Sequence, residues 1–287
     1  MPRSYKMCRL FGFRSVINSQ VHTSLIEAEN ALGHQSNYHP DGWGVSFYLK
    51  GSPHLIKSPG SAFGDSIFKK VSGVVSSQTV IAHIRKATLG ENSILNTHPF
   101  QFGKWTFAHN GNIKNFEQFK PIILERIHPE LRRFILGTTD SELFFFYLLT
   151  HLNQQNLIDT NHLDYKTLYK SVREAVEGLI QIIGEYSKID NAGEQETYLT
   201  FILTNGEIML AHQGGKHLNY STYKKRCPDR DSCPSFGQSC ETPTTNGLIN
   251  HLIFSSEPLS GENIWKPLKL GQIVGIDNGM KLTIEDR

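Results

Sequence analysis

Runs of β-branched and aromatic residues, bounded by turn-forming residues, occupy both ends of the chain and predict strands there. The dipeptide Asn205-Gly206 separates two of these runs and predicts a two-residue hairpin turn. Asn278-Gly279 provides the turn of a further hairpin. We predict strands over residues 9–17, 44–49, 54–57, 79–84 and 104–109, and again over 198–203, 207–211, 251–255, 272–276 and 280–284.

The middle of the chain changes to a helical spacing of apolar residues. Thr139 predicts the N-cap of a helix that contains the apolar run 143–149, and Glu142 completes a capping box. Because this run is apolar on nearly all sides, we expect the helix to be buried between other elements. Apolar residues recur at three- and four-residue intervals from Leu168 to Ile183 and predict a long amphipathic helix. Together these elements predict an α+β fold in which helices cover two sheets.

The composition is that of a soluble globular protein. The 287 residues suffice for one large domain or two smaller ones, with 38% hydrophobic and 20% charged residues. The net charge is only +2, whereas a nucleic-acid-binding protein is expected to carry a dense basic stripe. No apolar run approaches the roughly 20 residues of a membrane span, and residues 1–7 lack the apolar core of a signal peptide. We therefore expect a cytoplasmic protein without nucleic-acid or membrane partners.

Residues 214–247 form a polar segment that we interpret as a long loop or insertion. It contains Cys227, Cys233 and Cys240, which are separated by five and six residues. The short C-x2-C spacing of common zinc sites is missing, so reduced cysteines are the favoured interpretation. A zinc site or a disulfide stays open as an alternative.

Cys8 directly follows a second methionine, Met7, and is the first candidate for chemistry. If the mature protein begins at Cys8, one residue carries both a thiol and a free α-amine. The amine, with an unperturbed pKa of about 7.7–8.0, can accept the proton of the thiol, and the thiolate can attack a carbonyl. The alternative is a small buried cysteine at the start of a strand.

Two further segments suggest how an acyl group could be held. The pair Asn110-Gly111 follows an apolar strand, where it forms either a turn or an oxyanion site made of an amide side chain and a backbone N–H. Asp140 lies at the start of the predicted helix. Its carboxylate either favours the helix N-terminus electrostatically or receives the α-ammonium of an amino-acid substrate.

The segments around Pro40 and Arg85 complete the set. His39-Pro40-Asp41-Gly42-Trp43-Gly44 has the proline and glycines of a tight turn that leads into a strand. Arg85, at the end of a predicted strand, is either a surface residue or a grip for a substrate carboxylate. Combined, these segments provide a nucleophile, an oxyanion site and binding groups for both the carboxylate and the ammonium of an α-amino acid. Such a set suits cleavage of a side-chain amide.

The chain resembles the class II glutamine amidotransferases, which are N-terminal-nucleophile hydrolases, and is most similar to their small stand-alone members. The resemblance extends to residues 255–259 and Trp265 near the C-terminus. The motifs that carry it are Met7-Cys8-Arg9-Leu10-Phe11-Gly12, His39-Pro40-Asp41-Gly42-Trp43-Gly44, Ala82-His83-Ile84-Arg85-Lys86-Ala87-Thr88, Asn96-Thr97-His98-Pro99-Phe100, Ala108-His109-Asn110-Gly111 and Thr138-Thr139-Asp140-Ser141-Glu142.

The resemblance implies a four-layer αββα sandwich, with residues 8–287 as a single domain and residues 1–7 as a removable or non-native extension. It implies that Cys8 is the nucleophile and its own α-amine the general base. Asn110 and the backbone of Gly111 would form the oxyanion hole. Arg85, assisted by Thr88, would bind the substrate α-carboxylate, and Asp140 its α-ammonium. Lys86 and Leu89 stand where many larger relatives have Trp and His, so the contacts of those residues do not transfer.

The implied activity is the cleavage of glutamine through a γ-glutamyl thioester, which releases glutamate and ammonia without a metal or organic cofactor. One alternative is a γ-glutamyl hydrolase that acts on a peptide-like thiol compound. Another is a glutaminase subunit that supplies ammonia to a separate acceptor enzyme. A third is a noncatalytic regulatory module that retains residues 1–7.

Overall fold

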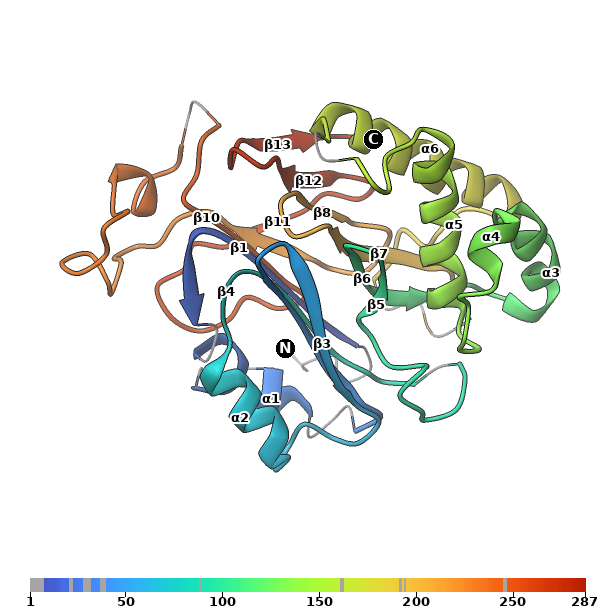
Figure 1. Cartoon of the computed structure of the whole chain (residues 1–287), viewed down its shortest axis with the longest axis horizontal. Coiled ribbons are helices and arrows are strands. Elements are labelled where there is room, and N and C mark those ends of the chain that lie inside the picture. Colours follow the sequence, from blue (N-terminus) through green and yellow to red (C-terminus); the bar gives the residue numbers. More distant parts are fainter. Residues whose placement is uncertain are drawn as a thin grey trace.

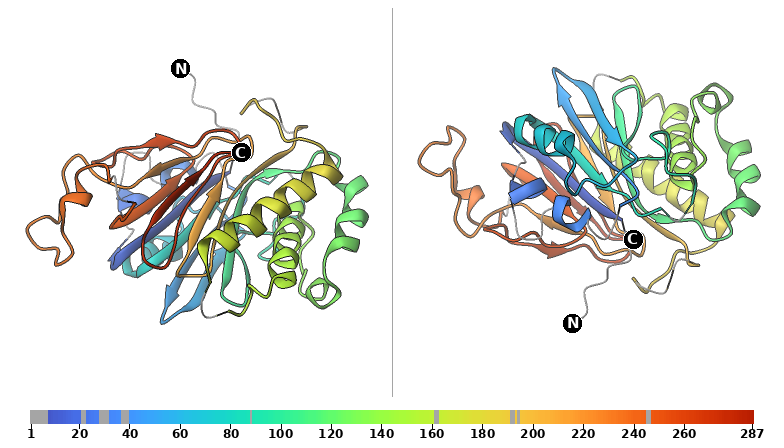
Figure 2. Two further views of the ribbon diagram at one scale, coloured as in Figure 1. Left: turned by 90° about the horizontal axis from the view of Figure 1, so that it is seen from above. Right: turned by 90° about the horizontal axis from the view of Figure 1, so that it is seen from below.

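Two antiparallel β-sheets pack face to face, and helices cover the outer face of each sheet (Figure 1, Figure 2). The computed structural model describes residues 8–20, 23–27, 32–36, 40–87, 89–160, 163–190, 193, 195–244 and 247–287. Within these residues, the first sheet has the order β11 (Lys266–Pro267), β9 (Asn219–Ser221), β10 (His251–Ser255), β1 (Arg9–Gln20), β4 (Ser76–Ile84), β2 (Trp43–Leu49) and β3 (Ser52–Ser58). The second has the order β13 (Leu282–Glu285), β12 (Ile273–Ile276), β8 (Met209–His212), β7 (Tyr198–Thr204), β6 (Trp105–Asn112) and β5 (Phe100–Phe102).

The helices divide between the two outer faces. The first sheet is covered by a short π-helix η1 (Thr23–Glu27), α1 (Leu32–Gln35) and α2 (Ser66–Val74). The second is covered by α3 (Phe116–Arg126), α4 (Pro129–Arg132), α5 (Asp140–Gln154) and α6 (Tyr165–Ile183). A 3-10 helix η3 (Gln238–Cys240) lies on the segment that extends to the left in Figure 1. The predicted arrangement of two sheets covered by helices is confirmed.

Alternation along the strands fills three apolar layers. Leu10 of β1 and Ile202 of β7 point into the space between the sheets, where both are fully buried. Phe11, the next residue of β1, points to the opposite face under α2. Gly12 lies close to the second sheet, because a Cβ there would be 3.0 Å from Ile202 Cδ1. The third layer lies between the second sheet and α3, α5 and α6.

The predicted central helices are present. The Thr139 hydroxyl caps α5 by accepting from the N–H of Glu142 at 3.3 Å, and α5 is buried on nearly all sides as expected. The capping box is only half correct. The Glu142 carboxylate accepts instead from the N–H groups of Leu136 and Gly137, in the segment that precedes the helix. Glu142 thus fixes the approach of the chain to Asp140.

The structure differs from the expected elements in a few places. Thr204 pairs with Met209, so the hairpin around Asn205-Gly206 has a four-residue loop rather than a two-residue turn. The Asn205 side chain accounts for the longer loop, since its Oδ1 accepts from the N–H groups of Glu207 and Ile208. The polar segment 214–247 is not entirely loop, because β9 joins the first sheet between β11 and β10.

Gly44 of β2 has no room for a side chain. A Cβ on it would lie 2.1 Å from the carbonyl oxygen of His98 and 2.9 Å from Pro99 Cδ. Gly44→Ala should therefore lower the free energy of unfolding by at least the roughly 1–3 kcal/mol typical of overpacking. Denaturant unfolding checks this. Gly60→Ala is the control, because its nearest neighbour would be Ser58 Oγ at 3.6 Å. Equal losses in the two variants would contradict the close contact at Gly44.

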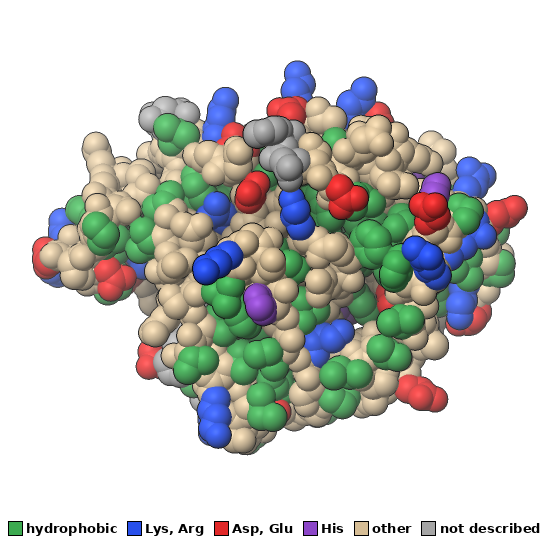
Figure 3. Space-filling model, in the orientation of Figure 1, with side chains coloured by type: hydrophobic (Ala, Val, Ile, Leu, Met, Phe, Trp, Pro, Cys, Tyr) green, Lys and Arg blue, Asp and Glu red, His purple; other side chains and the backbone are tan. Residues whose placement is uncertain are grey.

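Charges of both signs are dispersed over the face shown in Figure 3, with apolar side chains between them. That pattern matches the small net charge of +2. Among the described residues, no helix has the length and apolar character that a membrane crossing would need.

Candidate active site

The candidate residues of the first sheet lie together at one end of its central strands. Because neighbouring strands are antiparallel, the start of β1 lies beside the ends of β4 and β10. Cys8 immediately precedes β1 and Arg85 immediately follows β4. The Arg85 N–H donates at 2.7 Å to the carbonyl of Gly42, which precedes β2. Three segments that are far apart in the sequence therefore meet beside Cys8.

The Cys8 thiol is partly buried against the segment that follows β4. Its Sγ lies 3.2 Å from the N–H nitrogen and 3.3 Å from the carbonyl oxygen of Lys86. Cys8 directly precedes β1, and Leu10, two residues later, faces the inter-sheet core. Burial raises the pKa of the Cys8 thiol, while the Lys86 backbone and the charges of Arg85 and Arg9 oppose this rise. Since burial is the largest effect, the thiol needs a base to become a nucleophile.

Arg85 is 3% exposed and is held mainly by backbone carbonyls. Its Nη2 donates to Leu89 at 2.8 Å and to Gly90 at 3.3 Å, and its Nη1 donates to Asn92 Oδ1 at 3.0 Å. Further Nη1 contacts reach the carbonyls of Asp41 and Glu91 at 3.5 and 3.3 Å. Arg85 therefore organises residues 89–92 around itself. Thr88, its expected assistant, lies outside the described residues.

Asp41 is a site residue that the sequence analysis treated only as part of a turn. Its Oδ2 accepts from the N–H of Ala87 at 2.9 Å, and its Oδ1 accepts from Asn92 Nδ2 at 3.3 Å. These bonds, together with the contact to Arg85, attach the turn before β2 to the loop after β4. The available sequence signal was an acidic residue directly before Gly42, whose φ of 131° few other residues adopt.

Asn110 and Gly111 lie near the end of β6. Asn110 is 3% exposed and is on the same face of β6 as Ala108, which belongs to the inter-sheet core. Among the described residues, its side-chain amide has no hydrogen-bond partner. Its polar atoms retain some exposure, because they are not among the fully buried unpaired atoms. The amide is therefore available to a group that enters between the sheets.

The backbone N–H of Gly111 is directed away from β7. Gly111 pairs with Leu199, whose N–H donates to Gly214 and whose carbonyl accepts from His212. Because both groups of Leu199 point to β8, the pair with Gly111 is a non-hydrogen-bonded one. The N–H of Gly111 thus points to the other edge of β6, and β5 pairs there only with Trp105 to Phe107.

Asp140 is buried at the first turn of α5. Its Oδ2 accepts from the N–H of Ile113 at 2.6 Å, and its Oδ1 accepts from the N–H of Ser141 at 2.8 Å. Ile113 directly follows β6, so these bonds place the start of α5 beside the end of that strand. Burial raises the pKa of Asp140 to about 6, and the hydrogen bonds from Ile113 and Ser141 limit the rise.

The charge of Arg85 connects the two sides of the site. The Cys8 sulfur and the carboxylates of Asp41 and Asp140 all interact electrostatically with this guanidinium, whose pKa burial lowers. The Cys8 sulfur and the Asp140 carboxylate thus each lie within electrostatic range of the same guanidinium. The three groups come from the start of β1, the end of β4 and the start of α5.

The segment after β10 holds the start of β1. Ser256 exchanges two bonds with Leu10: the Leu10 N–H donates to Ser256 Oγ at 2.9 Å, and the Ser256 N–H donates to the Leu10 carbonyl at 3.1 Å. Arg9 forms an ion pair of 2.5 Å with Glu257. These contacts explain why residues 255–259 accompany the cysteine motif in the sequence.

His98 lies behind the site, in the inter-sheet region beside His83. The two ring centroids are 4.3 Å apart, and neither ring nitrogen of His98 has a hydrogen-bond partner among the described residues. Burial and the neighbouring histidines lower the pKa of His98 well below its usual value. His98 is therefore neutral near pH 7.

Of the three remaining cysteines, Cys240 lies beside Asn250, before the start of β10, and so at the opposite end of that strand from the segment that holds Leu10. Cys227, Cys233 and Cys240 carry free thiols, and Cys240 Sγ accepts from Asn250 Nδ2 at 3.0 Å. No group of three or more metal-ligating side chains occurs among the residues that the structure describes.

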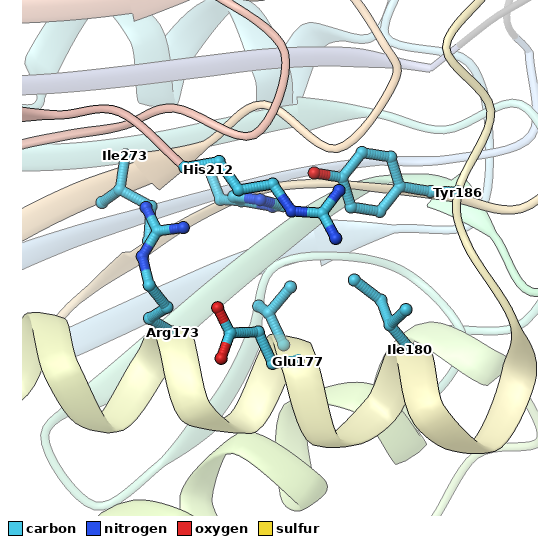
Figure 4. Close-up of a pocket in the computed structure, with 8 residues that line it drawn as sticks. Arg173, Glu177, Ile180, Tyr186, His212 and Ile273 are labelled. Carbon is cyan, nitrogen blue, oxygen red and sulfur yellow. The ribbon is translucent and has the colours of Figure 1, made fainter.

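A small pocket also lies outside the candidate site. It is situated between α6 and the helix-covered face of the second sheet, where Arg173 and Glu177 face His212 and Tyr186 (Figure 4). Asn110 lies on the inter-sheet face of β6, and neither Cys8 nor Asn110 lines this pocket. This pocket is therefore separate from the candidate site.

The family model of the class II glutamine amidotransferases matches residues 7–286. The chain belongs to the class II glutamine amidotransferases. Among similar members of known sequence is the Escherichia coli protein named putative glutamine amidotransferase YafJ, which is 26% identical over 286 residues, or 93% of this chain and 96% of YafJ. A shorter match, 39% identical over 72 residues, links 25% of this chain to 31% of a γ-glutamyl-hercynylcysteine sulfoxide hydrolase from Mycobacterium tuberculosis.

Solved structures of related proteins show the same fold. A glutamine aminotransferase class-II domain protein from Silicibacter pomeroyi gives a TM-score of 0.60 at 18% identity, covering 97% of this chain and 99% of that one. A glutamine phosphoribosylpyrophosphate amidotransferase from B. subtilis gives 0.58 at 15% identity, over 97% of this chain and 49% of that one. The αββα fold of the N-terminal-nucleophile hydrolases, expected from the resemblance, is confirmed for this chain.

Proposed function

We propose that the mature protein begins at Cys8 and hydrolyses the side-chain amide of glutamine through a γ-glutamyl thioester. The observation that carries this proposal is the placement of the segments: the Cys8 thiol lies 3.2 Å from the backbone N–H nitrogen of Lys86, the neighbour of Arg85, and Asp140 is bound to Ile113 at the end of the strand that carries Asn110 and Gly111. An α-amino acid has a carboxylate and an ammonium, and the opposite charges of Arg85 and Asp140 are complementary to them. Among the described residues, no acceptor contacts Arg85 Nε–H, and its Nη contacts of 3.3–3.5 Å are long enough to exchange for a substrate carboxylate.

The first step forms the thioester. The α-amine of Cys8 takes the thiol proton, and the thiolate attacks the δ-carbonyl carbon of glutamine. The Nδ2–H of Asn110 and the N–H of Gly111 donate to the oxyanion that develops. The Cys8 ammonium then returns the proton to the leaving nitrogen as the C–N bond breaks, and ammonia departs.

The second step releases the product. Water attacks the thioester carbonyl, and the α-amine of Cys8 accepts a proton from that water. The same two donors stabilise the second oxyanion. The C–S bond breaks, glutamate leaves, and the sulfur regains its proton. Neither step uses a group beyond those of the chain, the substrate and water.

The acid dependence of activity should report on Asp140. Burial raises the pKa of this carboxyl from 3.8 to about 6. As the pH falls through about 6 it gains a proton and loses the charge that holds the ammonium, so kcat/KM for glutamine should fall there. The check is a pH profile from 5 to 8. Glutaric acid monoamide has no α-amine and does not need the charge of Asp140. Its kcat/KM should therefore lack the fall near pH 6 and should depend on pH only through protonation of the Cys8 α-amine.

Protonation of Asp140 is expected to weaken substrate binding but to stabilise the fold. The pH dependence of stability therefore separates loss of substrate binding from unfolding as the cause of inactivation. The folded state binds this proton more tightly than the unfolded chain. The contribution of Asp140 to stability is therefore full below about pH 3.8 and is lost as the pH rises through about 6. Loss of activity near pH 6 without a fall in melting temperature would agree with the role in substrate binding. A profile that stays flat from pH 7 to 5 would contradict it.

A second candidate substrate is a γ-glutamyl amide of a thiol-containing compound, favoured by the 72-residue match to the mycobacterial γ-glutamyl hydrolase. The chemistry at Cys8 is the same, and only the leaving amine differs. Ammonia release from glutamine and amine release from γ-glutamyl-cysteine, measured with protein that begins at Cys8, separate the two. We expect a higher kcat/KM for glutamine. The absence of turnover with both would contradict the proposed function and favour a noncatalytic module. Ammonia transfer to a separate acceptor enzyme would appear as co-purification with that enzyme.

A further inference from the structure

A buried histidine lies directly behind the carboxylate that is proposed to bind the ammonium. His109 is 1% exposed and points, like Phe107, to the helix-covered face of β6. Its Nε2 is 2.9 Å from the carbonyl oxygen of Tyr198, and its Nδ1 is 2.9 Å from Ser141 Oγ. Ser141 is the neighbour of Asp140, so His109 reaches the site through one hydroxyl.

The carbonyl of Tyr198 fixes the tautomer of His109. A carbonyl oxygen only accepts, so Nε2 must carry the hydrogen in this contact. Burial lowers the pKa of His109 to about 4, and the ring is therefore neutral near pH 7. Nδ1 then has a lone pair and no hydrogen. It can only accept, and the hydrogen between it and Ser141 must come from the hydroxyl.

The Ser141 hydroxyl has a single hydrogen and two possible acceptors. Its oxygen is 2.9 Å from His109 Nδ1 and 3.3 Å from Asp140 Oδ1. The shorter contact is to the imidazole. With the hydrogen given to His109, Asp140 keeps one backbone donor on each oxygen, from Ile113 and Ser141. Each carboxylate oxygen then has a further lone pair for the substrate.

We infer that His109 is a positioning residue of the ammonium site: it takes the hydroxyl hydrogen of Ser141 and so keeps Asp140 Oδ1 open to the substrate ammonium. This inference rests on the proposed function. Without the imidazole acceptor, the hydroxyl turns to Asp140 Oδ1 and competes with the ammonium for it. Arg85, which follows β4, is a charged group that interacts electrostatically with the same carboxylate, and its own hydrogen bonds go to residues 41 and 89–92 rather than to Ser141 or His109.

Two substitutions of His109 separate the roles of its nitrogens. In His109→Gln the side-chain amide donates near the position of Nε2 but leaves no acceptor near that of Nδ1. In His109→Asn a carbonyl oxygen lies near the position of Nδ1. We expect His109→Gln to raise KM for glutamine about tenfold with a smaller change in kcat, the size expected when a charge-assisted hydrogen bond is lost. His109→Asn should change KM less. The hydroxyl bond also stabilises the carboxylate, so the acid limb of kcat/KM should move to lower pH in His109→Gln.

The double variant gives the sharpest test. Adding Ser141→Ala to His109→Gln removes the competing hydroxyl, so KM should return to within about threefold of the parent that begins at Cys8. A double variant as impaired as His109→Gln, or a His109→Gln variant with unchanged KM and acid limb, would overturn the inference while the parent activity leaves the proposed function standing. A parent that does not hydrolyse glutamine would overturn both.

Ser141→Ala alone provides an independent reading that avoids any change of packing at His109. If the Ser141 hydroxyl donates its hydrogen to His109, as inferred, its loss leaves the acceptor sites of Asp140 unchanged. KM should then stay within about threefold and the acid limb should not move. If the hydroxyl instead supports Asp140, its loss raises KM and moves the acid limb to higher pH, and this result would contradict the inference.

Discussion

Glutamine hydrolysis should be about 10²–10⁴-fold faster for protein that begins at Cys8 than for protein that retains Met7, the range a positioned general base contributes. Burial raises the pKa of the Cys8 thiol, so little thiolate forms unaided at neutral pH. A free α-amine on the same residue can take the proton. When Met7 is attached, that nitrogen is an amide and cannot. The measurement is ammonia release by the two proteins, with N-terminal sequencing of each.

Two cysteine variants control this comparison. Cys8→Ala in the protein that begins at residue 8 should abolish turnover, because no nucleophile remains. Cys233→Ser should leave it unchanged, since Cys233 lies in the polar segment outside the site. Equal activity of the proteins with and without Met7 would show that the α-amine is not the base.

Asn110→Ala should lower kcat for glutamine about 10²–10³-fold with a much smaller change in KM, as expected for the loss of one oxyanion donor. The Asn110 amide is buried at the inter-sheet face and has no hydrogen-bond partner among the described residues. It therefore contributes little to the fold. Its donor is used only when negative charge develops on the substrate carbonyl oxygen, so the loss falls on kcat.

Asn112 provides a matched control two residues later on the same face of β6. Its Nδ2 donates to the carbonyl of Glu196 at 2.8 Å and holds the segment before β7. Asn112→Ala should therefore lower the melting temperature and leave kcat nearly unchanged. Equal reductions of kcat in the two variants, or a rise in KM alone for Asn110→Ala, would contradict the oxyanion role of Asn110.

Much of the fold could be predicted because its strands and central helices have strong local signals. The periodicity of α6 and the apolar run of α5 identify both helices, and alternation identifies the long strands. Helix α3 was missed because it contains Pro121, a residue that usually argues against a helix, and its N-cap residue, Asn115, has a positive φ of 54° and no side-chain cap. Strands β5, β9 and β11 have two or three residues each and depend on partners that sequence patterns do not reveal.

The residues of the site could be proposed from the sequence, but their relations could not. Asn110, Arg85 and Asp140 each have an ordinary structural interpretation when taken alone. The antiparallel order of β1, β4 and β2 brings the first segments together, and the bonds from Asp140 to Ile113 and from Ser141 to His109 add the start of α5.

Contacts between segments that are distant in the sequence could not be predicted from local sequence patterns. The His109–Ser141 contact spans 32 positions, and the bond between Leu10 and Ser256 spans 246. These contacts decide which hydrogens and lone pairs are available in the site. They follow from tertiary packing, which spacing along the chain does not encode.

The most direct test of the account is covalent labelling of protein proven to begin at Cys8. Incubation with 6-diazo-5-oxo-norleucine, a glutamine-like electrophile, followed by peptide mass spectrometry, should give one adduct on the Cys8 sulfur, and excess glutamine should suppress it. An unmodified Cys8, or an adduct on Cys227, Cys233 or Cys240 instead, would contradict the assignment of Cys8 as the nucleophile.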